Sequence, residues 1–238
     1  MHAIERYELE RAAELLTLAY QNDTKTQLEM DGVENSEELL AIRAKDYLET
    51  LFGRGAVWIE ETQPKSILVA FQSKRFSNMR YLTMLRTSMN HIAEAAGKER
   101  LKKMAENGKK MKRLEDYVWH RKVPKKKKDT YYHLLTVFIE PESLDTDHVY
   151  DMLEPFMSYC DRYAMPMTYE SWNPEMTEIM KNLCFEVRKT KEVKACPGVT
   201  VCHMVRQPQR DEAENSGTEP QKSVEDTDDL YEGETDYE

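Results

Sequence analysis

The spacing of hydrophobic residues changes repeatedly along the chain, and this change constrains the fold more than any other feature. Helical spacing occurs in residues 7–20, 36–52, 78–104, 110–119, 147–163 and 174–183. Short apolar or β-rich runs typical of strands occupy residues 2–6, 56–59, 66–71, 131–139, 166–171, 185–190 and 199–205. The order predicts an α/β protein in which crossover helices link parallel strands.

Capping residues mark where several of these helices begin. Ser36 is the predicted N-cap of the helix that follows it, with acidic residues in its first turn. Pro174 stands at a first helical position. Either Thr146 or Asp147 is the predicted N-cap of the helix over 147–163, and this capping role is an alternative to any role in ligand binding.

The net charge of -10 is concentrated at the C-terminal end of the sequence. Residues 210–238 hold twelve Asp or Glu and two Lys or Arg, so the rest of the chain is neutral. This segment has almost no large aliphatic residues, and it cannot bury enough apolar surface to offset the entropy of ordering. We therefore predict a folded domain over residues 1–208 and a disordered acidic tail over 209–238.

Residues 98–128 form a basic stretch with fourteen Lys or Arg against four Asp or Glu, ending in four consecutive lysines. One interpretation is a solvated helix face and loop. A second is a site for a polyanionic ligand such as a nucleotide cofactor. Nucleic acid is the weakest of the three interpretations, because no RNP, KH, zinc-finger or helix-turn-helix pattern accompanies the lysines.

Other sequence features bear on the compartment. No run approaches the roughly 18 apolar residues of a membrane span, and the first residues lack the pattern of a secretory signal. The four cysteines form no CxxC pair, which favours reduced thiols. We expect a cytoplasmic protein without a membrane partner. The oligomeric state is not indicated by the sequence.

Three segments resemble the GNAT N-acetyltransferase superfamily in their order and spacing. They are residues 132–142 (YHLLTVFIEPE), 165–171 (MPMTYES) and 173–187, which contains KNLCFEV. They are similar to the family's fourth strand, its fifth strand and the segment that follows. The resemblance spans residues 2–206. It implies a single domain with a central mixed, mostly antiparallel sheet, flanking helices and one parallel pair of strands that splays apart.

The resemblance also implies a cofactor, acetyl-CoA or another acyl-CoA. In the family, backbone groups of the fourth strand bind the pantetheine arm, and the next loop and helix start hold the pyrophosphate, as the free N–H groups there allow. Carried onto this sequence, the cofactor-binding residues are Val137, Phe138, Ile139, Leu144, Asp145, Thr146, Asp147, His148, Val149 and Asn173.

Two departures from the family pattern concern that cofactor. The loop that usually carries glycines has none here, although close approach to a phosphate favours glycine. Asp145 and Asp147 add negative charge where a dianion would bind. The tyrosine that protonates the leaving thiol in many family members falls on Met180, which has no proton to give, and the family's glycine falls on Cys184.

The resemblance predicts an acyl-CoA-dependent N-acyltransferase in which a small amine or a peptide amino group attacks the thioester directly. Glu170 is the candidate general base, with a solvated strand-end carboxylate as the alternative. His133 is more often a packed residue than a base. The basic stretch could supply the contact to the 3′-phosphate. The alternative function is a non-catalytic binding or regulatory module that has kept the fold and lost the chemistry.

Overall fold

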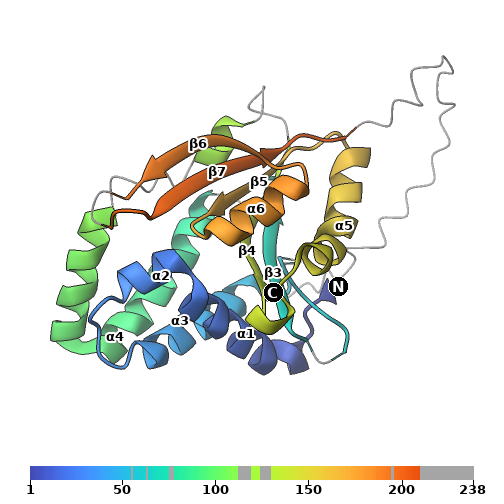
Figure 1. Ribbon diagram of the computed structural model, residues 1–238. Coiled ribbons are helices and arrows are strands. Elements are labelled where there is room, and N and C mark those ends of the chain that lie inside the picture. The colour runs from blue at the N-terminus through green and yellow to red at the C-terminus, as the bar shows by residue number, and fades with distance from the viewer. Residues whose placement is uncertain are drawn as a thin grey trace, which may run out of the picture.

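A seven-stranded sheet forms the centre of the computed structural model, with the strands in the order β1-β2-β3-β4-β5-β7-β6 (Figure 1). The structure describes residues 1–54, 56–62, 64–74, 78–111, 119–123, 130–193 and 196–209, apart from the side chains of 78–89. The predicted acidic tail beyond Gln209 and the lysines at 125–128 lie outside these residues. The strands are β1 (His2–Ala3), β2 (Val57–Ile59), β3 (Ser66–Gln72), β4 (Tyr132–Ile139), β5 (Met167–Ser171), β6 (Glu186–Glu192) and β7 (Thr200–Arg206).

Neighbouring strands are antiparallel except for β4 and β5, which are parallel. Their pairing ends at Leu134 and Tyr169, although β4 continues to Ile139 and β5 to Ser171. The two strands therefore splay apart towards their C-terminal ends. This confirms the predicted mixed sheet, but the parallel arrangement expected of all crossover-linked strands is wrong for β3 and β4, which pair antiparallel.

The helices cover both faces of the sheet. They are η1 (Arg6–Glu8), α1 (Leu9–Asn22), α2 (Thr24–Glu29), α3 (Ser36–Leu51), α4 (Asn78–Met111), η2 (Trp119–Lys122), η3 (Pro141–Ser143), α5 (Thr146–Arg162) and α6 (Pro174–Asn182). In Figure 1, α1 to α4 lie together, apart from α5 and α6. None of the helices described is both long and apolar enough to cross a membrane.

Alternation along the strands divides the core into two. Leu68 packs in a cluster with α5 and α6, whereas its neighbours Ile67 and Val69 pack against α1 and α3. This is the two-residue period of a strand that is buried on both faces. β6, in contrast, is an edge strand whose side chains are largely exposed.

Three local predictions need correction. Asn35, not Ser36, is the N-cap of α3; it has a left-handed backbone with φ of 48° and makes no side-chain capping bond. The helix predicted over 78–104 continues to Met111 and bends at Gly97, where φ is 68°. The short helix α2 was not expected. The region predicted as helix over 110–119 lies mostly outside the described residues.

Candidate functional site

A cavity of about 900 Å³ opens where β4 and β5 separate. All of the β4 residues from Leu134 to Ile139 line it, and so do residues of α1 to α4, of η2 and of the segment after β5. Beyond Leu134, the edge of β4 that faced β5 has no strand partner within the described part of the chain. Backbone groups of β4 are thus available to a ligand, as a donor and acceptor ladder.

The structure brings together only part of the predicted cofactor site. The cavity is lined by Val137, Phe138, Ile139, Leu144, Asn173 and Glu170. The residues of the helix start, Asp145, Thr146, Asp147, His148 and Val149, do not line it, and Val149 is fully buried in the core. The side chain of Asn173 caps α6 by accepting a hydrogen bond of 2.8 Å from the Glu175 N–H.

The carboxylate of Asp145 caps the first turn of α5. Asp145, rather than Thr146 or Asp147, is the N-cap, and its Oδ1 accepts a hydrogen bond of 2.7 Å from the backbone N–H of His148. This bond uses an N–H of the first helical turn, the group that anions bind at helix starts. The prediction that Thr146 or Asp147 is the cap is therefore wrong by one or two positions.

A second carboxylate reaches the same turn from the β2–β3 connection. Oε1 of Glu60 lies 2.6 Å from Nε2 of His148, and its Oε2 accepts a bond of 2.7 Å from the Lys65 N–H. The other ring nitrogen of His148 faces the Ser143 carbonyl at 3.2 Å. Burial opposes ionisation of Glu60, but the bonds from Lys65 and His148 together lower its pKa. Glu60 therefore joins the β2–β3 connection to α5.

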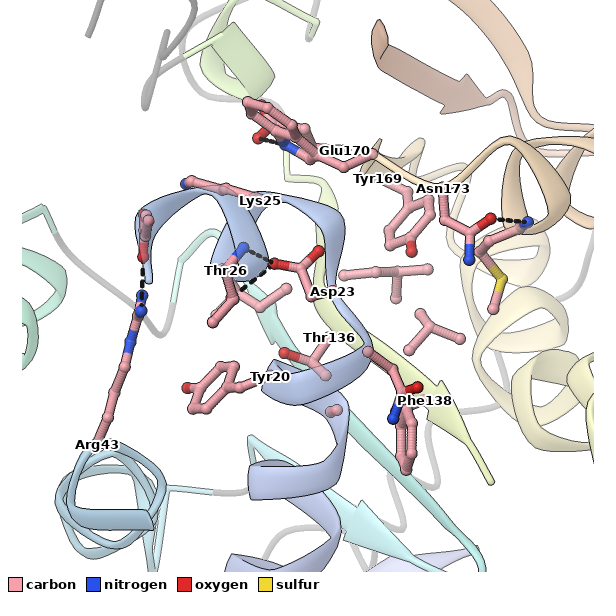
Figure 2. A pocket seen from close by; sticks show the side chains of 18 of the residues that line it. Tyr20, Asp23, Lys25, Thr26, Arg43, Thr136, Phe138, Tyr169, Glu170 and Asn173 are labelled. Atoms are coloured by element: carbon pink, nitrogen blue, oxygen red, sulfur yellow. Dashed lines mark hydrogen bonds and ion pairs between the residues drawn. The ribbon is translucent and has the colours of Figure 1, made fainter. Parts of the chain in front are cut away.

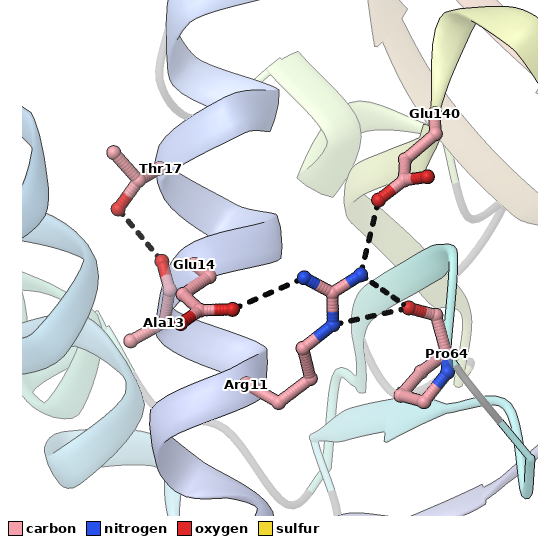
Figure 3. A network of polar contacts seen from close by, with 6 residues as sticks. All are labelled: Arg11, Ala13, Glu14, Thr17, Pro64 and Glu140. Carbon is pink, nitrogen blue, oxygen red and sulfur yellow. Dashed lines mark hydrogen bonds and ion pairs between the residues drawn. The ribbon is translucent and has the colours of Figure 1, made fainter.

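Arg11 is bound within the chain near the end of β4 (Figure 3). Its Nε and Nη2 donate to the Pro64 carbonyl at 3.2 and 2.8 Å, and Nη2 also donates to Glu140 at 3.0 Å. Nη1 donates to Glu14 at 3.1 Å. The Arg11 guanidinium therefore joins α1 to the β2–β3 connection and to the residue after β4.

At the helical end of the cavity, Asp23 is a residue that the sequence analysis missed. It N-caps α2, and its Oδ2 accepts bonds of 2.9 and 2.7 Å from the N–H and hydroxyl of Thr26. Burial nevertheless raises the pKa of Asp23 above its usual value. Figure 2 shows its carboxyl pointing into the space between Thr136 and Tyr169, at the splay of β4 and β5.

Tyr169 supplies a phenol on the other side of that space. It is buried, and burial together with the charges of Asp23 and Glu170 raises its pKa. The hydroxyl therefore keeps its proton at neutral pH. Met180, the position that the resemblance assigns to the family's tyrosine, is fully buried in α6 and does not line the cavity.

A partly buried ion pair stands next to Asp23. Nη1 of Arg43 lies 2.8 Å from Oε2 of Glu29, and the guanidinium lies over the Tyr20 ring, 4.9 Å from its centroid. Burial opposes ionisation of Glu29, but the charges of Arg43 and Lys25 lower its pKa. Both members of the pair are ionised, and they line the cavity between α2 and α3.

The Glu170 carboxylate contacts two aromatic side chains, those of Trp172 and His203. Trp172 Nε1 donates to its Oε1 at 2.9 Å, and Nε2 of His203 lies 3.3 Å from its Oε2. The Trp119 ring stacks on His203 with centroids 4.3 Å apart. Burial opposes ionisation of Glu170, but His203, Lys25 and Trp172 together lower its pKa. An anion with a depressed pKa is a weak base, so the catalytic role of Glu170 stays a prediction.

His133 lies on β4 and packs against β5 and η2. Its Nδ1 lies 2.8 Å from the Thr168 hydroxyl, and its ring stacks on that of His120 at a centroid distance of 4.1 Å. Burial and the nearby His120 hold the pKa of His133 well below its usual value. The ring is therefore neutral and serves as part of the cavity wall.

No family model and no curated protein matches the sequence, but solved structures match the fold. Arylalkylamine N-acetyltransferase 2 from Aedes aegypti has a TM-score of 0.55 at 10% identity, covering 87% of this chain and 98% of that one. An agmatine N-acetyltransferase has a TM-score of 0.52 at 12% identity, with the same coverage. The C-terminal condensation domain of Ebony, in complex with beta-alanyl-dopamine, has a TM-score of 0.56 at 8% identity, covering 86% and 96%. The chain has the fold of the GNAT N-acetyltransferases.

Proposed function

We propose that the protein is an N-acyltransferase that transfers an acyl group from a pantetheine thioester, as in acetyl-CoA, to a small cationic amine. The observation that carries this proposal is the cavity at the splay of β4 and β5, which exposes the β4 backbone beside the Asp23 carboxyl. The fold shared with N-acetyltransferases of arylalkylamines and agmatine supports the same class of reaction.

The charge of the cavity supports an amine acceptor. Four acidic residues line its described wall, against two basic ones: Asp23, Glu29, Glu170 and Glu175 against Lys25 and Arg43. Aromatic side chains stand among them: Tyr20, Tyr47, Trp119, Tyr169 and Trp172. Carboxylates and aromatic faces together attract ammonium groups and repel anionic acceptors.

Asp23 is the candidate general base. An ammonium group must lose a proton before its nitrogen can attack the thioester, and a carboxylate whose pKa is raised by burial is a better proton acceptor than an exposed one. Tyr169, on the opposite side of the splay, keeps its proton because its pKa is raised, so it would hydrogen-bond to the leaving sulfur rather than protonate it. Backbone N–H groups of β4 would polarise the thioester carbonyl.

The test is an acyl-transfer assay on the full chain with acetyl-CoA and three amines of different charge. We expect the guanidinium-bearing amine agmatine to react faster than the neutral-ring amine tyramine, and the carboxylate-bearing amine β-alanine to react slowest. Release of free thiol and the mass of the amide product would measure the reaction. Absence of transfer to any amine would favour the non-catalytic module instead.

A further inference from the structure

The loop after β4 has the charge of a site that rejects phosphate. Residues 140–149 contain Glu140, Glu142, Asp145 and Asp147 and no Lys or Arg. The sequence has no Lys or Arg at all between Lys128 and Arg162. A diphosphate placed along this loop would meet several negative charges within a few ångströms, with no basic side chain of the loop itself to offset them.

The polar groups of this region are also already bonded to one another. The His148 N–H donates to Asp145, the His148 ring contacts Glu60, and Arg11 is bonded to Glu140, Glu14 and the Pro64 carbonyl. The arginine and the helix start that lie next to β4 are thus bonded to carboxylates of the chain. A diphosphate would have to break these bonds as well as overcome the negative charge.

The pantetheine part of the site has no such obstacle. Residues 134–139 of β4 line the cavity, and their edge towards β5 carries no strand beyond Leu134 in the described part of the chain. An amide-containing arm can pair with this edge as a strand would, without any contact to a phosphate. The pantetheine arm of an acyl-CoA would therefore find an open strand edge in this protein, whereas its diphosphate would meet negative charge.

From these observations we infer that the acyl donor is recognised through its pantetheine arm alone, so that the nucleotide half of coenzyme A is not required. The inference rests on the proposed N-acyl transfer. In that step the amine nitrogen bonds to the thioester carbonyl carbon and the C–S bond breaks. The sulfur keeps the electron pair and becomes a thiol by taking up the proton that the amine has lost.

The experiment compares acetyl-CoA with acetyl-pantetheine, which lacks the nucleotide, on the full chain with the same amine. One charge-assisted hydrogen bond corresponds to about a tenfold change in affinity. We therefore expect the two values of kcat/KM to differ by less than about tenfold. A preference for acetyl-CoA of about tenfold or more, especially one that falls with salt, would show a phosphate site elsewhere, such as the basic stretch, and overturn the inference.

Binding separates this inference from the proposed function. If neither thioester reacts, the proposed function fails, but equilibrium binding of CoA and of pantetheine still decides the present question. Equal binding supports the inference, and tighter binding of CoA or binding of neither overturns it. Acetyl-phosphopantetheine on a carrier protein, compared with free acetyl-pantetheine, would show whether the thioester is tethered or free.

A double variant tests whether Asp145 and Asp147 are the reason that the nucleotide half of coenzyme A is not recognised. Asp145→Gly with Asp147→Gly removes two negative charges and frees the His148 N–H, so the ratio of kcat/KM for acetyl-CoA over acetyl-pantetheine should rise about tenfold. The control, Asp151→Asn with Glu154→Gln, removes two charges from α5 beyond its first turn and should leave the ratio unchanged. An unchanged ratio in the glycine variant, with the fold intact by circular dichroism, would overturn the role of these carboxylates.

Discussion

Acidic side chains stand at the helical end of the cavity and in the region around the start of α5, but they are used differently. At the helical end, Asp23 and Glu170 line the cavity, and the carboxyl of Asp23 points into it. Around the start of α5, Asp145 and Glu60 bond to the backbone and side chain of His148 instead. The difference teaches that a carboxylate's role follows from its surroundings: Asp23 caps α2 and also faces the cavity, whereas Asp145 and Glu60 lie outside the cavity lining and stabilise the fold.

The largest expected effect is at the helical end. Asp23→Asn keeps the oxygen that accepts the Thr26 bonds but cannot take a proton, so kcat/KM for acyl transfer should fall by about 100-fold or more. Because burial disfavours the charged carboxylate, the melting temperature should not fall. Asp31→Asn, at an exposed position in the same region, is the control. Full activity of Asp23→Asn would exclude Asp23 as the base.

The second effect concerns the ion pair beside Asp23. Glu29→Gln removes the carboxylate that pairs with Arg43, whose side chain is about a quarter exposed. The change should lower the free energy of unfolding by about 2 kcal/mol. Because the folded-state pKa of Glu29 is lowered, its contribution is present above the unfolded pKa of about 4.3 and is lost as the pH falls through the folded value.

Urea unfolding at neutral and at acid pH measures both effects of the Glu29 change. The difference between the natural protein and Glu29→Gln should shrink at low pH. Glu178→Gln, which breaks an exposed ion pair with Lys181, is the matched control and should change stability by less than about 0.5 kcal/mol. An equal loss of stability in the two variants would contradict the conclusion that the Glu29–Arg43 pair is more buried than the Glu178–Lys181 pair.

The third prediction concerns Glu60, beside the start of α5. Glu60→Gln weakens the contacts with His148 and the Lys65 N–H, and should cost about 1 kcal/mol of stability. Acyl transfer should be retained, in contrast to the Asp23 variant. Chemical unfolding and the acyl-transfer assay measure the two quantities. A loss of activity without a loss of stability would show that the two regions are not as different as their contacts indicate.

The smallest expected effect is at Cys184, just after the C-terminal end of α6. Cys184 has a φ of 64° and follows a helix end in which the N–H groups of Cys184 and Phe185 donate to Lys181 and Met180. This is the position that glycine usually takes. Cys184→Gly should therefore raise the free energy of unfolding by about 0.5–1 kcal/mol. Gly97→Ala, at a φ of 68°, is the reverse case and should lower it by a similar amount.

Much of the fold could be predicted because the signals are local. The strand and helix order follows from the hydrophobic period, and the parallel pair follows from the resemblance of residues 132–142 and 165–171. The family's glycine position on Cys184 is a backbone requirement, and the positive φ there agrees with it. Asn35 and Asp145 were missed as N-caps because neighbouring residues of similar capping propensity compete for the position.

The helical end of the site could not be predicted in the same way. Asp23 lies in a short connection between two helices, where an N-cap is the ordinary explanation for an aspartate. Only the packing of α1 and α2 against the sheet brings its carboxyl to the splay of β4 and β5, more than 100 residues away in the sequence. Similarly, nothing local indicates that Glu170 meets Trp172, His203 and Lys25.

The edge strand β6 has a consequence for behaviour at high concentration. Among the described residues, no strand covers its outer side, and five of its seven residues are charged: Glu186, Arg188, Lys189, Lys191 and Glu192. A second molecule that added a strand there would have to desolvate these side chains, and charge on an edge opposes such growth. These charges thereby protect the β6 edge of the sheet against edge-to-edge aggregation.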